Sequence, residues 1–263
     1  MPVLCHEYHF EPPKKPAQTS EELPAASGGR GTSFRYQPVE LFVPGLRSHR
    51  CKKKKKKRPV PMKTLGRGAF GEAILYRKSE ANQLVVWKEM SISNARVAKE
   101  VEKEIEILSL LSHPNIIAYL NHYLDLEANM LYIEMEYANG GSLYHKIVQQ
   151  EESEGYFPEE TVLWYLYQIT SSMQYIHNKN ILHRDVKTLN IFLTKSGLTK
   201  LGDFGMSKIL DSSSHMAQTL AGTPYYMSPE MVKGQPYNSK SDMWAVGCVL
   251  HEILTLQKTF MAT

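Results

Sequence analysis

The sequence predicts a two-lobed α+β fold, with a small strand-rich lobe first and a helical lobe after it. Short runs rich in apolar and β-branched residues follow one another between residues 60 and 88. Beyond residue 95, apolar residues recur at three- and four-residue steps, which is typical of helices. Because the chain shows no internal repeat, this order of elements favours a sheet lobe joined to a helical lobe.

Residues 1–58 are rich in Pro, Gly, Ser and charge, and they predict a disordered basic tail. Within this tail, Lys52–Lys57 and Arg58 form a run of like charge. Such a run serves as a nuclear-import signal, a tether to an acidic surface or a solvated linker, and the sequence leaves these open. Residues 59–263 are expected to form one domain, with an N-terminal lobe over 59–137 and a C-terminal lobe over 138–263.

The positive charge of the chain belongs to the tail. Residues 1–60 carry thirteen Lys and Arg against five Asp and Glu, whereas residues 61–263 carry eighteen against twenty-two. The folded part therefore gives no electrostatic reason to bind nucleic acid. Three scattered cysteines, Cys5, Cys51 and Cys248, match neither a disulfide framework nor a zinc site. With no signal peptide and no apolar run that could span a bilayer, we expect a soluble intracellular protein.

Individual elements can be placed along the folded part. Strands are expected at Met62–Leu65, Ala73–Tyr76, Leu84–Lys88 and Leu131–Glu136. Pro61 suits only the start or the edge of the first strand, because it lacks a backbone N–H. Helices are expected at residues 95–112, 158–178 and 239–256.

Gly66, Gly68 and Gly71 lie in a loop between two predicted strands. A dinucleotide-binding fold would place such a loop between a strand and a helix, so that alternative does not fit. Glycines let the backbone approach phosphates closely with its N–H groups pointing inward. The loop is therefore a candidate for binding phosphates, and Lys88 on the next strand but one supports this interpretation.

Lys88 is expected to bind the α- and β-phosphates of ATP and to be positioned by a glutamate of the 95–112 helix. The helix offers Glu102, Glu104 and Glu106. Glu104 borders the apolar face, whereas Glu106 lies further round toward water. We therefore predict the ion pair Lys88–Glu104.

The stretch from His183 to Asn190, followed by Asp203-Phe204-Gly205, carries the most specific pattern in the chain. Asp185 is expected to orient a substrate hydroxyl and accept its proton, and Lys187 to neutralise charge on the transferred phosphoryl group. Asn190 and Asp203 are expected to hold Mg²⁺. His183 is interpreted as a packed structural residue that forms an apolar column with Phe204, Leu108 and Tyr119.

These motifs, in this order, resemble those of the eukaryotic serine/threonine protein kinases from about Val60 to Thr263. The resemblance implies the bilobal protein-kinase fold, with ATP and Mg²⁺ as cofactors and protein Ser/Thr residues as substrates. Lys187 after the His-Arg-Asp triplet matches the serine/threonine form of the catalytic loop.

The expected nucleotide site combines the glycine loop with residues of both lobes. Ala73 and Val86 stand where the general kinase patterns have valine and alanine, which is a volume-conserving exchange above the adenine ring. Met135 is expected at the back, the backbone of Glu136 and Ala138 at the adenine edge, and Phe192 below. The full predicted ATP-binding set is Leu65, Gly66, Arg67, Gly68, Ala69, Phe70, Gly71, Glu72, Ala73, Val86, Lys88, Met135, Glu136, Ala138 and Phe192.

The segment between Asp203 and Ser228 is rich in Ser and Thr. Arg184 offers a phosphate on this loop a partner. Of the candidates Ser212, Ser213, Ser214, Thr219 and Thr223, Thr219 is the predicted phosphorylation site. An upstream activating kinase is the partner that this implies. Thr223 is expected to help hold Lys187 and Asp185 instead.

More narrowly, the chain resembles the NIMA-related (Nek) kinases in five segments, Gly66–Ala73, Leu84–Glu89, Ile181–Lys195, Gly222–Glu230 and Ser241–Cys248. This resemblance implies mitotic or cell-cycle signalling and a cytoplasmic location, with the nucleus, centrosome or spindle as further sites. It also implies a helical lobe without its last helices. Glu230 is then expected to be a buried carboxylate without its arginine, and the helix carrying Asp242 to be partly uncovered.

Three functions are compatible with these features. The first is an active ATP-dependent serine/threonine kinase. The second is a noncatalytic nucleotide-binding fragment that acts as a decoy or partner of a full-length kinase. The third is an adaptor that works through the Lys52–Lys57 run.

Overall fold

The structure is a computed structural model, and it describes residues 60–68, 71–78, 82–125, 128–210, 216–217 and 222–260. All of these lie in one compact unit, Arg47–Thr263. The predicted tail over residues 1–58, with Lys52–Lys57, lies outside the described residues. Within the described ranges, none of the helices has the length and apolar character needed to cross a membrane.

The first lobe is built on an antiparallel sheet of five strands in the order β1-β2-β3-β5-β4. The strands are β1 (Val60–Gly68), β2 (Gly71–Lys78), β3 (Gln83–Ser91), β4 (Tyr119–Asp125) and β5 (Met130–Glu136). β1 lies at the edge of the sheet, as Pro61 requires. The sequence did not predict β4, in which polar Asn121 and His122 interrupt the apolar pattern.

Alternation along the strands gives the sheet two faces. Val86 is paired with Leu75 and Met135, and Lys88 with Ala73 and Ile133. We call the face that carries Lys88 the inner face and the face that carries Trp87 the outer face. The predicted placement of Ala73 and Val86 on one side of the sheet is therefore confirmed.

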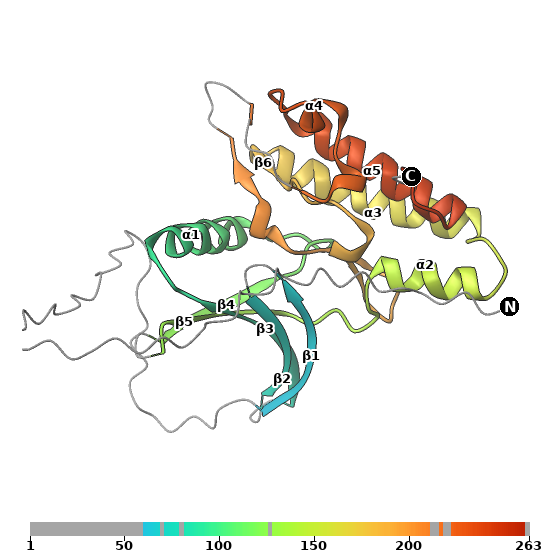
Figure 1. The fold of residues 1–263 in the computed structure, drawn as a ribbon. Helices are drawn as coiled ribbons and strands as arrows, with labels where there is room; N and C mark the ends of the chain where they lie inside the picture. Colours follow the sequence, from blue (N-terminus) through green and yellow to red (C-terminus); the bar gives the residue numbers. More distant parts are fainter. Residues whose placement is uncertain are drawn as a thin grey trace, which may run out of the picture. The chain divides into compact units, whose positions relative to one another are not determined.

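Helix α1 (Ala95–Leu110) follows β3 and begins at Asn94, whose side chain accepts hydrogen bonds from the N–H groups of Arg96 and Val97. The second lobe contains α2 (Leu143–Glu152), α3 (Glu159–His177), α4 (Pro229–Val232) and α5 (Ser239–Thr255). Figure 1 shows α3 and α5 running side by side, and the two helices are in contact. The sequence predicted α1, α3 and α5 within two residues at each end, but it missed α2 and the four-residue α4.

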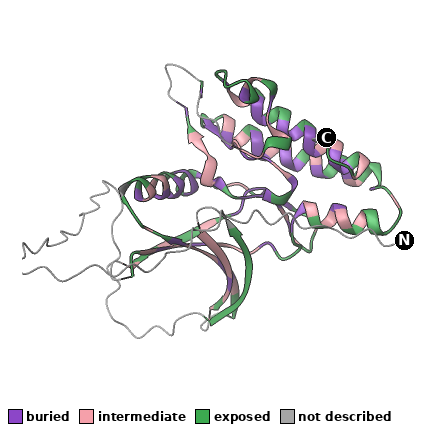
Figure 2. Ribbon diagram, viewed as in Figure 1, coloured by how far each residue is buried: buried purple, intermediate pink, exposed green. Residues whose placement is uncertain are grey.

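Short strands complete the second lobe and position its loops. β7 (Ile191–Leu193) pairs with β8 (Thr199–Leu201), and β6 (Ile181–Leu182) pairs with β9 (Lys208–Ile209). Three-residue 3-10 helices lie at η1 (Thr188–Asn190), η2 (Phe204–Met206) and η3 (Pro224–Tyr226). The apolar core is continuous between α1, α3, α5 and the strands β6, β7 and β8, and Figure 2 shows buried residues along the three helices. The α+β, two-lobed prediction is confirmed.

Glu230 differs from expectation. The sequence predicted a buried, unpaired carboxylate, but Glu230 is only half-buried and accepts a hydrogen bond of 2.6 Å from Ser241 Oγ. This hydroxyl lowers the pKa of the Glu230 carboxyl despite partial burial. Helix α5, which carries Asp242, is partly uncovered, as expected. Its Met243, Trp244 and Leu254 side chains are exposed, and Trp244 is stacked on Phe260.

The centre of the sheet should dominate the stability of the first lobe. Ile133 of β5 is 0% exposed, whereas Leu120 of β4 is 43% exposed. We expect Ile133→Ala to lower the free energy of unfolding by about 2–5 kcal/mol, because it leaves a cavity among packed side chains. Chemical denaturation measures this, with Leu120→Ala as the matched control. Similar losses in the two variants would contradict the central packing of Ile133.

Candidate active site

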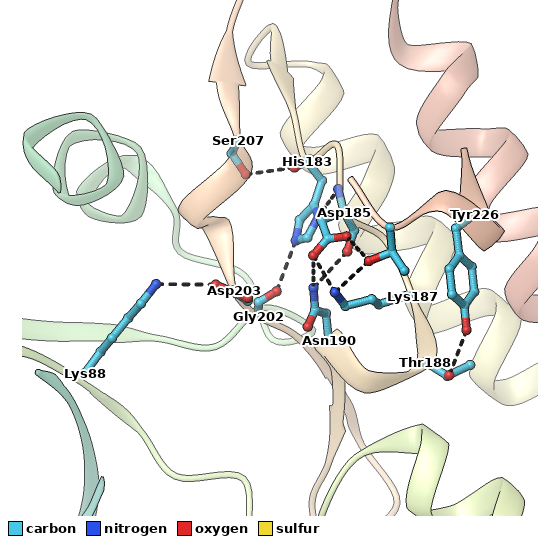
Figure 3. Close-up of polar contacts among 11 residues, drawn as sticks. Lys88, His183, Asp185, Lys187, Thr188, Asn190, Gly202, Asp203, Ser207 and Tyr226 are labelled. Atoms are coloured by element: carbon cyan, nitrogen blue, oxygen red, sulfur yellow. Dashed lines mark hydrogen bonds and ion pairs between the residues drawn. The ribbon is translucent and has the colours of Figure 1, made fainter. Parts of the chain in front are cut away.

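The loop after β6 brings together the side chains that the sequence singled out (Figure 3). Asp185 Oδ2 accepts hydrogen bonds from Lys187 Nζ at 2.7 Å and from Asn190 Nδ2 at 3.0 Å. Thr223 Oγ1 donates to Asp185 Oδ1 at 2.7 Å and accepts from Lys187 Nζ at 2.8 Å. The predicted role of Thr223 in holding Asp185 and Lys187 is therefore confirmed.

Helix α5 holds the backbone of this loop in place. Asp242 is buried, and its two carboxylate oxygens accept hydrogen bonds of 2.9 Å from the N–H groups of His183 and Arg184. His177 Nε2 lies 2.8 Å from the same carboxylate. Arg184 adopts a positive φ of 66°, which is costly for a residue other than glycine. Asp242 therefore stabilises a strained turn that aims Asp185.

His183 is a packed residue, as predicted. It is completely buried, its Nε2 lies 3.1 Å from the carbonyl oxygen of Gly202, and its ring meets Phe204 edge-on at 4.8 Å. Leu108 and Phe204 belong to the same buried cluster, and Tyr119 packs against it. These contacts connect α1 to the catalytic loop.

Lys88 extends from β3 toward the second lobe, where Figure 3 shows it pointing at Asp203. Its Nζ lies 2.7 Å from Glu104 Oε1 and 3.4 Å from Asp203 Oδ1. Glu104 is buried on α1, whereas Glu102 is half-buried and Glu106 is exposed. The choice of Glu104 as the partner of Lys88 is confirmed.

Opposing effects set the charges of this cluster. Burial alone would raise the pKa of Asp203, but Lys88, His183 and Lys187 outweigh it and hold the pKa below its ordinary value. For Lys88, burial would lower the pKa, but the carboxylates of Glu104 and Asp203 raise it overall. Both groups are therefore ionised at neutral pH.

The residues predicted to bind Mg²⁺ fit that ion. Both hydrogens of the Asn190 amide are directed at Asp185, to the carbonyl oxygen at 2.9 Å and to Oδ2, so the side-chain oxygen of Asn190 faces away. The Asp203 side chain is 47% exposed and ionised. An amide oxygen and a carboxylate are the hard oxygen ligands that Mg²⁺ prefers.

The glycine loop joins β1 to β2, as predicted, and Gly68 is paired with Gly71. Gly71 has a φ of 149°, and a side chain there would collide with the carbonyl oxygen of Glu89. Leu65, Gly66 and Arg67 lie on β1, and Glu72 and Ala73 on β2. Ala69 and Phe70 lie outside the described residues.

The segment expected at the adenine edge is braced by a contact that the sequence did not predict. Glu136 binds Lys200 of β8 through both carboxylate oxygens, at 2.8 and 2.9 Å. The same carboxylate accepts a hydrogen bond from the N–H of Ala118, and the Glu136 N–H donates to the Ala118 carbonyl. Ala138 follows this braced residue.

Two further residues of the predicted nucleotide site flank this segment. Met135 precedes Glu136 and lies opposite Val86 on the inner face of the sheet. Phe192 lies half-buried on β7, where it is bridged to Ser142.

A second network that the sequence missed links the catalytic loop to η3. Glu252 of α5 is buried, and it accepts hydrogen bonds from Tyr226 Oη at 2.6 Å and from Thr188 Oγ1 at 3.3 Å. Burial raises the pKa of Glu252 and also that of Tyr226. Figure 3 shows Tyr226 reaching Thr188 across the end of the loop.

The Arg184 side chain donates hydrogen bonds to two of the described residues. Its Nε donates to the Met206 carbonyl oxygen at 2.5 Å, and Nη1 donates to Tyr237 Oη at 3.2 Å. Thr219, the predicted phosphorylation site, lies outside the described residues.

The protein kinase domain family matches residues 60–263 of the chain. The chain is 56% identical over 206 residues to the serine/threonine-protein kinase Nek9 of Mus musculus and 57% identical over 206 residues to Nek9 of Xenopus laevis. Both matches cover 78% of this chain, but only 20% and 21% of the relatives. Nek8 of Danio rerio is 46% identical over 203 residues, covering 76% of this chain and 28% of that relative.

These matches confirm the resemblance to the NIMA-related kinases, and the likeness extends to the ninth member of that family. The chain spans about a fifth of the length of the Nek9 relatives.

The balance of charges at Asp203 can be tested directly. In Lys88→Met, burial is opposed by fewer positive charges, so the pKa of Asp203 should rise. In the wild type the pKa is depressed, so the ionised carboxylate contributes stability above about pH 4, and this is lost as the pH falls. A ¹³C NMR titration of the Asp203 carboxyl measures the shift. Lys200→Met removes a cation that pairs with Glu136 instead, and serves as the control. An unchanged pKa in Lys88→Met would show that Lys88 does not set the charge of Asp203.

Proposed function

This chain belongs to the protein kinase domain family, and from that premise we propose that it transfers the γ-phosphoryl group of Mg-ATP to serine and threonine hydroxyls of proteins. One observation carries the proposal. Asp185, Lys187, Asn190 and Thr223 converge within hydrogen-bond distance of one another, on a loop whose backbone α5 holds in place.

Each side chain has a distinct task in this proposal. Asp185 orients the substrate hydroxyl and accepts its proton. Its carboxylate is held from three sides by Lys187, Asn190 and Thr223, so it does not need to reorganise before it acts. The Lys187 ammonium stabilises negative charge that develops on the transferred group.

Lys88 and the metal-binding pair serve the nucleotide. Lys88, which Glu104 positions at 2.7 Å, binds phosphate oxygens. Asn190 and Asp203 hold Mg²⁺, which when bound neutralises charge on the phosphates. The inner face of the sheet around Ala73 and Val86 packs on the adenine, with the braced Glu136–Ala138 segment at its edge.

The biological setting is also part of the proposal. The resemblance to the NIMA-related kinases supports a role in cell-cycle signalling and a cytoplasmic, nuclear or centrosomal location. Phosphorylation of Thr219 by an upstream kinase is proposed to order the segment around it. Arg184 supports this, because it donates to Tyr237, which is bridged to Ala217, two residues before Thr219.

Activity should depend on the Asp185 carboxylate. We expect the purified chain to incorporate radiolabelled phosphate from ATP into a generic protein substrate, and Asp185→Asn to lower the rate by about 10²–10⁴-fold, because the proton acceptor is lost. Glu151→Gln, at an exposed position of α2, is the matched control and should retain the wild-type rate. Equal incorporation by the wild type and Asp185→Asn would rule out the proposed mechanism.

Nucleotide binding can be measured separately from turnover. Mg-ATP at about 100 times its dissociation constant should stabilise the folded chain by about 2.7 kcal/mol, because it binds the native state only. Lys88→Met should reduce the shift in a thermal unfolding assay. A full shift without phosphoryl transfer would favour the noncatalytic nucleotide-binding alternative, and no shift would contradict both.

A further inference from the structure

The outer face of the five-stranded sheet carries an aromatic cluster on the side away from Lys88. The outer-face cluster consists of Tyr76 of β2, Trp87 of β3, Tyr132 of β5 and Tyr123 of β4. The Trp87 ring lies 4.8 Å from Tyr76, 5.3 Å from Tyr123 and 5.6 Å from Tyr132, measured between ring centroids. Tyr123 is 39% exposed, and the other three rings are half-buried. Antiparallel sheets commonly present polar residues on a face that meets only water, so aromatic rings on this face are compatible with a partner that covers them.

Carboxylates surround this cluster. Glu89 accepts a hydrogen bond of 2.7 Å from Tyr76 Oη, and Glu134 accepts one of 3.0 Å from Tyr123 Oη. Glu134 also contacts the Lys78 ammonium. Glu89 has no ion-pair partner among the residues that the structure describes.

The carboxylates of Glu72 and Glu89 repel one another. Glu72 of β2 lies directly opposite Glu89 of β3 on the outer face. Like charges at directly opposed positions destabilise a sheet. Glu72 nevertheless stays ionised, because hydrogen bonds from Thr64 and then Arg67 lower its pKa. Glu72 is paired with the Arg67 guanidinium at 3.2 Å, so the uncompensated negative charge beside the aromatic rings is that of Glu89, and a cationic ligand would compensate it.

The outer face also offers a donor without an acceptor. The Trp87 indole N–H is buried and has no hydrogen-bond partner within the described ranges. An unpaired buried N–H is costly, and a backbone carbonyl of a docked segment can satisfy it.

A strongly basic segment lies within reach of this face. Lys52–Arg58 ends two residues before Val60, the first residue of β1. Trp87 is paired with Ile74, which is paired with Thr64 of β1. Two strand spacings and four residues along β1 place Trp87 roughly 16 Å from Val60. An extended chain covers at most about 3.6 Å per residue, so Lys52–Lys55 can reach the cluster from Val60.

We propose that the outer face of the sheet is the docking surface for the Lys52–Arg58 segment of the same chain. Lysine ammonium groups lie over the rings of the outer-face cluster and pair with Glu72 and Glu89. The rings supply cation–π attraction, and the opposed carboxylates supply the charge that selects a basic segment. None of these residues belongs to the catalytic loop, so docking does not require phosphoryl transfer. Glu72 belongs to the predicted ATP-binding set, but its register with Glu89 places it on the face opposite to that of Lys88.

Zero-length cross-linking of lysines to carboxylates, applied to the full chain and read by mass spectrometry, tests the proposal. We expect amide links from Lys52–Lys55 to Glu89 and Glu72, falling several-fold when the salt rises from about 0.1 to about 1 M, since screening shortens the range from about 10 to about 3 Å. Trp87→Leu keeps both carboxylates and should lower the yield of these links, whereas Glu89→Gln combined with Glu72→Gln removes the reacting groups and serves as the blank. Circular dichroism checks that each variant is folded.

The chain contains its own control. Glu151, Glu152 and Glu154 form another exposed group of carboxylates, at the end of α2. Links to this group as abundant as those to Glu89 would show nonspecific attraction and overturn the proposal, as would the absence of links to Glu72 and Glu89. Mixing ¹⁴N- and ¹⁵N-labelled chains distinguishes the occupant, because links between differently labelled chains would assign the face to a second copy instead. Asp185→Asn should cross-link like the wild type, which separates this result from any failure of kinase activity.

Discussion

A single buried carboxylate, Asp242, underlies the arrangement of the candidate active site. It receives three polar hydrogens, two from consecutive backbone amides and one from His177. Together they hold Arg184 in a left-handed conformation that would otherwise relax. Asp185 follows directly, so its direction depends on a contact made 57 residues later in the chain. Helix α5 is thus a support for chemistry that takes place on a loop.

In both lobes, short polar contacts likewise fix each functional segment to a rigid element. Glu104 ties Lys88 to α1, and Lys200 ties Glu136 to β8. The Phe204–His183 contact connects α1 with the catalytic loop through apolar packing. The site is therefore assembled from several elements. Loss of any one of these contacts should displace the reacting groups without removing them.

Much of this arrangement could be predicted from local pattern. Strand alternation and helical periodicity placed β1–β3, β5, α1, α3 and α5, and the face of α1 identified Glu104. Thr223 was also assigned correctly, from its place in the segment after Asp203. What the sequence could not supply were contacts between residues far apart with no local signal. Lys200 and Glu136 are separated by 64 positions, and either could be an ordinary surface charge. Helix α2 was missed because it is short and its apolar stripe rests on two buried residues, Leu143 and Ile147.

Two separate restrictions exclude a side chain at Gly71. Its backbone conformation and its closeness to the Glu89 carbonyl both exclude a side chain, and the second restriction arises from β3 rather than from any nucleotide. The third glycine of the loop is thus dictated by how hairpin and neighbouring strand fit together. Replacing it would first disorder the sheet register, so a variant here would report on assembly of the lobe and not on affinity for phosphate.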